Sequence, residues 1–556
     1  MKKLFAGLGV LLVAVAALAW SFRTDLLLAF IHRSSEIEVA AFRPVPWQTG
    51  PQMAQEVAPA SGPDKRPNII FILADDLGIN DIQTFGGDVA NSRVPTPGIG
   101  RLAKGGVTFT QAYAGNATCA PSRAMLMTGR YPTRHGFEFT PTPPGMSNAV
   151  SLMGNEMDTG LPPIDYNDEV RAGIPEYNDQ GLPGSEVTIA EVLKASGYHT
   201  AHIGKWHLGL GSEYGPNAQG FDESLLMSNG LHLPEDDAHV VNAALEFDPI
   251  DRFLWARMRF AAQYNEGELF APGGYLTDWW TDEAINVIRN NRNRPFFLYL
   301  AHWAVHTPLQ ATKDDFDAVG DIEPHRLRVY AAMVRALDRS VGRIMAELDT
   351  LGLTDNSLVV FSSDNGGAGY IGIPDVNAPY RGWKMTFFEG GIRAPLLLHW
   401  PAAIAAGQAV DSPVAHIDLM PTFAAAAGTT PPSDRIIDGV NLVPAATGTG
   451  PVIRPNDALF WQSGYYQAVR RGDWKLQVDG REGKKWLFNL AEDPTEQTNL
   501  AAEEHRMTAE LTTLLERHQA GRTPPRYPFT VESPTPIDKT RAEKVEPGDE
   551  YIWWPN

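Results

Sequence analysis

Apolar residues follow two alternating patterns along this chain. Short, nearly unbroken apolar runs are typical of strands buried on both faces of a parallel sheet. These runs are residues 68–74, 296–301, 357–362 and 395–399. Between them, apolar residues recur at helical spacing. These stretches are residues 185–195, 278–290 and 327–351. The alternation predicts an α/β fold with a large, mixed, mostly parallel central sheet sandwiched by helices.

The pattern changes near the C-terminus. Residues 458–489 read as short, aromatic-rich strands separated by turns, and residues 503–519 read as one helix. We therefore expect a small C-terminal antiparallel sheet with one helix. The Pro-rich tail, residues 521–556, reads as irregular, but its adjacent Trp553 and Trp554 are costly to expose. We expect the tail to pack on its own body or on a twin subunit, which would make a homo-oligomer.

The N-terminus has the features of an export signal. Lys2 and Lys3 precede residues 4–20, which carry no charge, as in a secretory signal peptide. We therefore expect an exported, periplasmic protein. Residues 17–19 offer a cleavage site, but the apolar character continues at residues 26–31, so an uncleaved membrane anchor facing the periplasm or exterior is the alternative.

Composition divides the chain into five segments. They are a signal peptide or anchor (1–34), a linker rich in Pro, Ala and Gln (35–66), a catalytic domain (67–440), a C-terminal α+β subdomain (441–520) and the tail (521–556). The net charge of −20 repels polyanions and argues against a nucleic-acid partner. The single cysteine rules out an internal disulfide and a Cys-rich metal site.

Two pairs of polar residues follow predicted buried strands. Asp75 and Asp76 come directly after one strand, and Asp364 and Asn365 follow another. Because the carboxyl ends of parallel strands meet at one edge of a sheet, we expect these side chains to converge. Adjacent carboxylates repel each other unless a cation lies between them, and their oxygens suit Ca²⁺ or Mg²⁺. We expect no clustered His and Cys ligands, which argues against zinc.

Two motifs carry a family resemblance. The lone Cys119 begins Cys-x-Pro-x-Arg, which ends at Arg123 and leads into an apolar run and Thr-Gly-Arg. Residues 197–209 read Gly-Tyr-His-Thr-Ala-His-Ile-Gly-Lys-Trp-His-Leu-Gly. In this order and spacing, the two motifs resemble the signatures of type I sulfatases, arylsulfatase-like members of the alkaline phosphatase superfamily. The resemblance extends from about Pro67 to Leu500.

The resemblance implies a modified catalytic residue. In that family the cysteine is oxidised to formylglycine (3-oxoalanine), and the hydrated aldehyde is the nucleophile; here that residue would be Cys119. It would bind Ca²⁺, with Mg²⁺ as the alternative, together with Asp75, Asp76, Asp364 and Asn365. The resemblance therefore also implies a formylglycine-generating enzyme as a partner.

Five further residues receive roles. Arg123, one helical turn after Cys119, would lie beneath the formylglycine and steady it. Lys205 and His207 would face the same way in an extended segment, with Lys205 neutralising a sulfate oxygen and His207 holding the diol. His306, in a His-x-Pro-Leu segment like the family's, would protonate the leaving oxygen. Lys384 matches the second family lysine, between the sulfate and the leaving group.

The expected function is hydrolysis of sulfate monoesters, with a small-molecule or sugar sulfate ester as substrate. Residues 137–183 are expected to rim the pocket. A set of aromatic residues assigned to the rim favours an aryl or otherwise hydrophobic sulfate. These residues are Phe137, Phe139, Trp255, Tyr264, Trp279 and Trp280. Two alternatives stay open. One is a phosphonate monoester or phosphodiester hydrolase of the same superfamily, and the other is a non-catalytic receptor for sulfated ligands.

Overall fold

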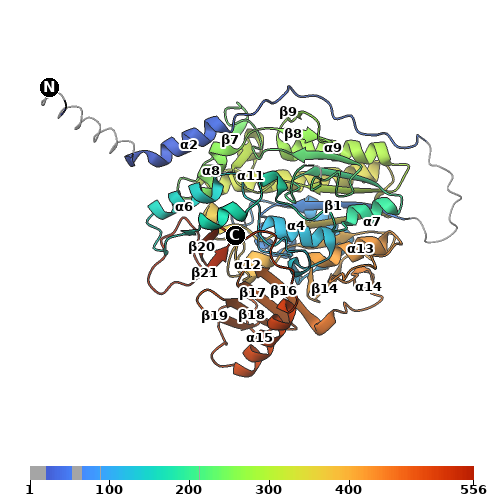
Figure 1. The fold of residues 1–556 in the computed structure, drawn as a ribbon. Coiled ribbons are helices and arrows are strands. Elements are labelled where there is room, and N and C mark those ends of the chain that lie inside the picture. Colours follow the sequence, from blue (N-terminus) through green and yellow to red (C-terminus); the bar gives the residue numbers. More distant parts are fainter. Residues whose placement is uncertain (1–4, 6–19, 53–65, 88, 212) are drawn as a thin grey trace.

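A central sheet of ten strands dominates the computed structural model, which describes residues 5, 20–52, 66–87, 89–211 and 213–556 (Figure 1). From edge to edge its strands are β14 (Gln408–Val410), β2 (Val107–Phe109), β13 (Leu396–His399), β12 (Ser357–Ser363), β1 (Asn68–Ala74), β10 (Phe296–Ala301), β5 (His199–Gly204), β6 (Glu223–Met227), β8 (Ala262–Tyr264) and β9 (Leu269–Phe270). The middle strands, β12 to β6, run parallel. Antiparallel pairs flank them on both sides. The predicted mixed, mostly parallel sheet is confirmed.

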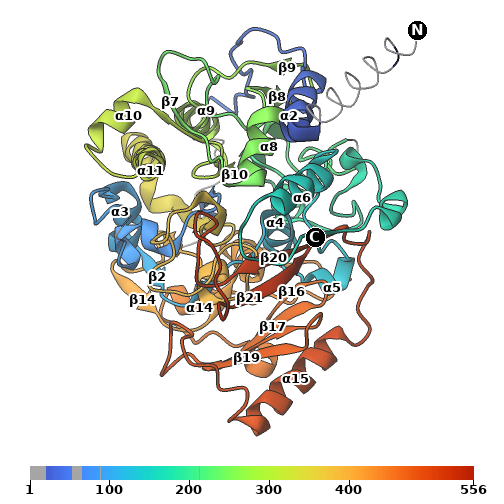
Figure 2. The same ribbon diagram turned by 90° about the vertical axis from the view of Figure 1, so that its left-hand side faces the viewer.

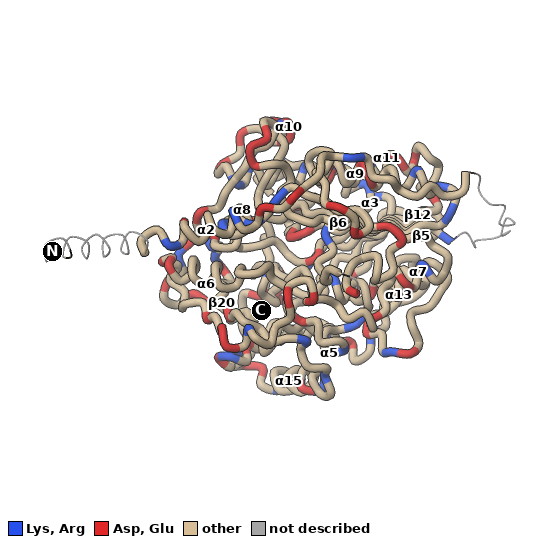
Figure 3. Tube along the Cα trace, turned by 45° about the horizontal axis from the view of Figure 1, so that its top comes forward, with Lys and Arg blue, Asp and Glu red and all other residues tan. Residues whose placement is uncertain are grey.

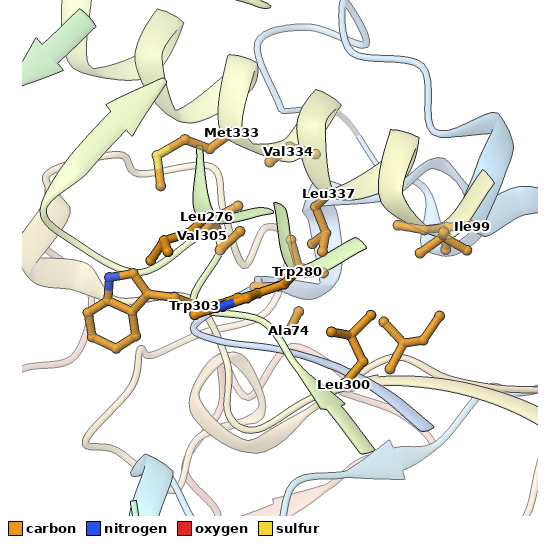
Figure 4. Close-up of a cluster of buried hydrophobic side chains, with 14 of the residues drawn as sticks. Ala74, Ile99, Leu276, Trp280, Leu300, Trp303, Val305, Met333, Val334 and Leu337 are labelled. Atoms are coloured by element: carbon orange, nitrogen blue, oxygen red, sulfur yellow. The ribbon is translucent and has the colours of Figure 1, made fainter. Parts of the chain in front are cut away.

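Helices cover both faces of the sheet, as predicted (Figures 1 and 2). One face carries α3 (Pro97–Gly105), α9 (Leu276–Asn291) and α11 (His325–Thr350), and the other carries α4 (Cys119–Thr128), α7 (Ile189–Ala195) and α13 (Leu419–Ala426). Figure 4 shows Leu337 of α11 directed toward Trp280 of α9, above Leu300 of β10, and Met333 of α11 above Leu276. Burial of these apolar side chains fixes the helices on the sheet.

Helix α7 is shorter than the sequence pattern suggested. The apolar spacing predicts a helix over residues 185–195, whereas α7 begins at Ile189. Thr188 forms a capping box, in which its side chain accepts from the Glu191 amide and the Glu191 carboxylate accepts from the Thr188 amide. These two bonds satisfy amides at the helix start, so the helix begins there.

The predicted C-terminal sheet is present. It contains β16 (Ala458–Ser463), β17 (Tyr466–Arg471), β18 (Trp474–Asp479) and β19 (Lys484–Asn489), all antiparallel, and α15 (His505–Gln519) packs on it. A buried ion cluster links this sheet to the short helix α12 (Glu389–Ile392). Lys475 Nζ lies 2.8 Å from Glu389 Oε1 and 3.0 Å from Glu496 Oε1.

The expectation of an irregular tail is wrong. Strand β20 (Val531–Pro536) pairs with β21 (Tyr551–Pro555), which contains Trp553 and Trp554, and with β4 (Asp165–Tyr166). Both tryptophans are buried within the same chain. Composition predicted an irregular tail because prolines cannot donate to a ladder. Pro534 and Pro536 are tolerated in β20 because they lie beyond Val531 and Glu532, the residues that pair with β4, and so have β21 on one side only. The tail packs on its own body, so the buried tryptophans give no reason to invoke a twin subunit.

The described part of the N-terminal region packs against the body. Helix α2 (Arg23–Ser34) contacts α6 (Met146–Glu156) and α8 (Pro249–Arg257), with Ile31 buried against Phe253. Most of the uncharged run 4–20 lies outside the described residues. Within the part that is described, no helix combines the length and apolar character needed to cross a membrane.

The segment assigned as a linker is only partly described. Residues 35–52 form no helix or strand of their own, yet Trp47 is buried and donates from Nε1 to Glu283 at 2.6 Å. Ala40 forms a bridge with Phe270 of β9. This stretch therefore runs along the body in a fixed position, and residues 53–65 lie outside the described part.

Other short elements lie in the connections. They are the strands β3 (Ala112–Tyr113), β7 (Val240–Ala243), β11 (Leu309–Thr312) and β15 (Val414–Ala415), the helices α5 (Pro132–His135), α10 (Lys313–Ala318) and α14 (Val443–Ala446), and a 3-10 turn, η6 (Gly369–Ile371). The turn η6 follows β12 and contributes to the functional site, as described next.

Candidate active site

The carboxyl ends of β1 and β12 bring four polar residues together. The strands are parallel neighbours in which Ala74 pairs with Ser363, so the residues that follow each strand meet. Asn365 donates from Nδ2 to Asp76 Oδ1 at 2.7 Å, and the Asp76 amide donates to Asp364 Oδ1 at 3.3 Å. Asp76 has a φ of 59°, a conformation that costs energy for a residue with a Cβ.

Cys119 is the first residue of α4 and points at these carboxylates. Its Sγ lies 3.5 Å from Asp75 Oδ1 and 3.9 Å from Asp76 Oδ1, and the residue is 2% exposed. Burial, followed by the charges of Asp364 and Asp75, raises the pKa of the Cys119 thiol well above its ordinary value. In this environment the unmodified side chain is a neutral thiol rather than a thiolate.

Arg123 lies one turn further along α4 and links the two strand ends. Its Nη2 is 3.0 Å from Asp75 Oδ2, and its Nε donates to Asp364 Oδ2 at 2.9 Å. The residue is fully buried. Since a buried charge is stable only when it is paired, Arg123 and the two carboxylates hold one another in place. Its observed contacts are thus with the carboxylates beside Cys119.

Lys205 follows β5 and reaches the same carboxylates. Its Nζ lies 2.7 Å from Asp75 Oδ2 and 4.7 Å from the ring centre of Trp303. His207 has a φ of 62°, so the backbone is not extended at that residue, and this part of the expectation is wrong. Both residues nevertheless line one cavity. Burial lowers the pKa of His207 well below its ordinary value.

Lys384 and His306 surround the second carboxylate. Lys384 Nζ lies 2.8 Å from Asp76 Oδ1 and donates to His306 Nε2 at 3.3 Å. Burial raises the pKa of Asp76, but the neighbouring charges, that of Lys384 foremost, outweigh burial and leave that pKa below its ordinary value. Burial lowers the pKa of His306 well below its ordinary value. His306 is stacked on Trp303, with ring centres 3.9 Å apart.

Two residues in this cluster were missed from the sequence. Tyr370, in η6, donates from its hydroxyl to Asp76 Oδ2 at 2.9 Å and accepts from Lys384 Nζ at 3.1 Å. Trp303 supports both Lys205 and His306. Neither has a distinctive local pattern, although Trp303 stands three residues before His306. Their roles follow from spatial position alone.

The donor set fits a cation. Asn365 Oδ1 is buried and has no hydrogen-bond partner among the described residues, although a buried acceptor is normally satisfied. It faces a group of carboxylate oxygens, which suits Ca²⁺ or Mg²⁺. The ligand atoms of Asp75, Asp76, Cys119 and His306 lie within 4.8 Å of one another. The expectation that no His and Cys cluster here is therefore wrong, and that argument against zinc no longer holds.

The site opens on a cavity of about 740 Å³, which is lined by Cys119, Lys205, His207, His306 and Lys384. The predicted rim segment contributes to its wall through Thr140, Pro141 and Met146. The six aromatic residues assigned to the rim are absent from the lining formed by the described residues. Four of them are buried elsewhere: Phe137, Phe139, Trp279 and Trp280. The aromatic argument for an aryl sulfate is therefore wrong.

Comparison with protein families gives two matches. The family described as Sulfatase matches residues 67–429. The family described as N-sulphoglucosamine sulphohydrolase, C-terminal, matches residues 381–521. The first match contains every candidate site residue described above, from Asp75 to Lys384.

Individual proteins are also similar to this chain. N-acetylgalactosamine-6-sulfatase of Rattus norvegicus is 34% identical over 426 residues, which cover 75% of this chain and 72% of the relative. Steryl-sulfatase of Homo sapiens is 32% identical over 488 residues, which cover 76% of each chain. The crystal structure of Ps i-CgsB matches with a TM-score of 0.68 at 30% identity, covering 83% of this chain and 95% of that chain. The same protein is also solved in complex with k-i-k-neocarrahexaose.

Proposed function

Since this chain belongs to the sulfatase family and is a sulfuric ester hydrolase, we propose that it hydrolyses sulfate monoesters with a formylglycine made from Cys119. One observation carries the proposal. Cys119 lies at a cavity where the side chains of Lys205, Lys384 and His306 converge on Asp75 and Asp76. A nucleophile position, two cations and a proton donor are what sulfate transfer requires.

The oxidised side chain explains the need for a cysteine in this position. The hydrated aldehyde would supply two hydroxyls on one carbon, one to attack sulfur and one whose deprotonation re-forms the carbonyl and releases sulfate. Covalent catalysis of this kind divides one difficult step into two easier ones. The formylglycine-generating enzyme that oxidises Cys119 is the partner this proposal requires.

The surrounding side chains then have distinct roles. Lys205 and Lys384 neutralise the sulfate oxygens as negative charge develops. His306 protonates the oxygen of the leaving alcohol, and its stacking on Trp303 fixes the ring for that transfer. His207 holds the hydrated side chain of residue 119. Arg123 keeps Asp75 and Asp364 aligned through its two contacts.

A hard cation completes the site. Asp75, Asp76, Asp364, Asn365 and modified residue 119 would hold Ca²⁺, or Mg²⁺ as the alternative. Such an ion supplies positive charge that stabilises anionic oxygens in the reaction. The unsatisfied Asn365 Oδ1 supports this ligand set. Oxygen donors outnumber the single histidine, which favours Ca²⁺ over zinc.

A sugar sulfate is the substrate class that we propose. The cavity wall offers amide side chains able to bind hydroxyl groups beside aromatic rings on which a sugar can pack, and its volume of about 740 Å³ exceeds the needs of one aryl ring. The amide residues are Asn178, Gln180, Asn217, Asn229 and Gln263. One similar protein is named for a sulfated sugar, and another binds a neocarrahexaose. A panel of sugar, steroid and aryl sulfates, with a phosphonate monoester and a phosphodiester beside them, tests this assignment by kcat/KM.

Cys119 provides the decisive experiment. Protein produced together with a formylglycine-generating enzyme should show Cys119 as the aldehyde or its hydrate in peptide mass spectra, and it should turn over sulfate esters. Cys119→Ser supplies a single hydroxyl, so we expect no multiple turnover and a sulfate ester retained on the substituted serine. Cys119→Ala controls for the loss of any nucleophile. Steady turnover by Cys119→Ser, or by chains with an unmodified thiol, would refute the mechanism.

A further inference from the structure

Arg541 is a buried cation that the proposed reaction does not use. It belongs to the C-terminal tail and lines the same cavity as Cys119, with 11% of its side chain exposed. Its guanidinium has no hydrogen-bond partner within the described part of the chain, and its Nε is fully buried. Arginine has five N–H donors, so this environment leaves binding capacity unused.

The tail holds Arg541 in a defined place. Its amide donates to the Gly369 carbonyl at 3.0 Å, and Gly369 precedes Tyr370, whose hydroxyl contacts Asp76. The turn after Arg541 is closed by Thr540, which donates from Oγ1 to Glu543 at 2.8 Å. Arg541 therefore lies on an ordered segment whose backbone is hydrogen-bonded to Gly369, the residue before Tyr370 of the reaction centre.

Arg541 has one acidic neighbour, and the contact is loose. Its Nε lies 3.9 Å from Asp248 Oδ1, whereas charge-assisted N–H to O bonds span about 2.7–2.9 Å. Asp248 already caps α8, because its Oδ2 accepts from the Asp251 amide at 2.8 Å. Asp248 partly balances the charge of Arg541, but the facing atoms, Asp248 Oδ1 and Arg541 Nε, are both buried without a hydrogen-bond partner among the described residues.

The charges of the cavity differ from those of the whole protein. The chain has a net charge of −20, yet the described cavity lining contains Lys205, Lys384 and Arg541 against one acidic residue, Glu266. Both lysines are engaged by Asp75 and Asp76 in the reaction centre. Of the lysines and arginines in this described lining, Arg541 is the one without an ion pair to Asp75 or Asp76.

We propose that Arg541 forms a second anion subsite, which binds a carboxylate or a second sulfate on the alcohol part of the substrate. This inference rests on the proposed sulfatase reaction and narrows its substrates to esters with two anionic groups. A planar guanidinium binds carboxylate and sulfate oxygens in pairs, and it does so strongly in a cavity that excludes much of the water.

The test compares substrates that differ by one anionic group. N-acetylgalactosamine 6-sulfate is the monoanion, its 4,6-disulfate adds a sulfate, and a disaccharide of the 6-sulfate with a uronic acid adds a carboxylate. For Arg541→Gln, we expect the ratio of kcat/KM for the dianion to that for the monoanion to fall about 10- to 100-fold, mainly through KM. If the ratio falls for the 4,6-disulfate, Arg541 binds a sulfate; if it falls for the disaccharide, Arg541 binds a carboxylate.

Two variants serve as controls. Lys544→Gln removes the same charge from an exposed position three residues later and should leave the ratio unchanged. Asp248→Asn removes the charge that partly balances Arg541 and keeps the guanidinium, so the ratio should stay the same or rise, and it should not fall. If Arg541 serves only to pair with Asp248, Arg541→Gln will lower the Tm and reduce kcat/KM equally for all three esters. That result would overturn the proposal.

A binding measurement separates this proposal from the proposed function. The Cys119→Ala chain, with and without Arg541→Gln, is titrated with the same three esters in a calorimeter. If a dianion binds more tightly than the monoanion, and only when Arg541 is present, the result supports the subsite. Absence of turnover of all three esters would count against the proposed function and would leave this binding result unaffected. Equal binding of all three esters by both chains would refute the subsite.

Discussion

At the scale of single residues, the site balances two adjacent carboxylates with separate cations. Asp75 is paired with Lys205 and Arg123, whereas Asp76 is paired with Lys384. This division allows two neighbouring aspartates to remain buried, because each has its own counter-charge. It also places both lysines where a sulfate group would meet them. The acidic pair therefore organises the cations of the site as well as offering ligands to a metal.

Metal removal should abolish turnover. Chelation should reduce activity to background, and Ca²⁺ or Mg²⁺ should restore it, because oxygen ligands favour hard cations. Asp364→Asn should weaken metal binding at least about tenfold in calorimetric titrations, since it removes one charged ligand. Asp355→Asn, at an exposed position before the same strand, is the matched control. Full activity without metal, or restoration by zinc alone, would contradict the assignment.

The role of His306 should depend on the leaving group. His306→Gln should lower kcat about 100- to 10,000-fold on sugar sulfates, because an alkoxide needs a proton to leave. The loss on nitrophenyl sulfate should be much smaller, since that phenolate is stable. His325→Gln, on the surface, controls for loss of an imidazole. Equal losses on both substrates would move the acid role to another group, with Lys384 the first to examine.

At the scale of elements, buried charges connect the C-terminal sheet to the catalytic domain. Lys475 of β18 contacts Glu389 of α12 and Glu496, and all three side chains are fully buried. Burial raises the pKa of Glu389, but the charge of Lys475 outweighs it and brings that pKa to about 2. Because α12 follows closely after Lys384, this cluster supports a segment of the active site from outside the central sheet.

Breaking that cluster should destabilise the protein. Lys475→Met removes the cation beside the buried Glu496 and leaves Glu389 with Arg393, and we expect a loss of about 3–5 kcal/mol in the free energy of unfolding. Urea unfolding followed by tryptophan fluorescence measures this loss. Lys485→Met, on the exposed side of the neighbouring strand β19, should change stability by less than about 0.5 kcal/mol. Similar stabilities for the two variants would show that the cluster contributes little.

At the scale of the whole molecule, acidic and basic residues are spread along the chain, with several acidic residues near α10 (Figure 3). The net charge of −20 discourages polyanions from approaching any arbitrary face. An anionic ester can still bind, because the cavity lining is locally basic. The net negative charge of the chain favours solubility, whereas the basic residues of the cavity lining provide the positive charge that an anionic substrate needs.

Export of the chain can be tested by cell fractionation and by mass spectrometry of the N-terminus. We expect the protein to fractionate with exported proteins when it is produced in a bacterium with a periplasm, because Lys2 and Lys3 precede an uncharged run. Mass spectrometry of its N-terminus then distinguishes cleavage after Ala19 from a retained anchor. Glu in place of both lysines should reduce export. An unprocessed chain that stays in the cytoplasm would refute the export prediction.

The sequence by itself determined the main architecture and the location of the chemistry. Nearly unbroken apolar runs predicted β1, β10, β12 and β13, because most positions of a strand covered on both faces are apolar. The runs did not indicate β5, which is buried but contains His199, Thr200 and His202. The geometry of parallel strands then required the residues after β1 and β12 to meet. The motifs around Cys119 and Lys205 indicated the family, since their residue types and order are specific.

Only the tertiary structure decided which side chains face the cavity. Trp279 and Trp280 could have been rim or core residues on composition alone, and the packing of α9 on the sheet buries both. Tyr370 and Arg541 are separated by about 170 positions in the sequence, yet the tail brings Arg541 against the turn that contains Tyr370. The local sequence pattern shows which positions are apolar. Whether such a side chain faces the cavity or the core depends on which distant element packs against it.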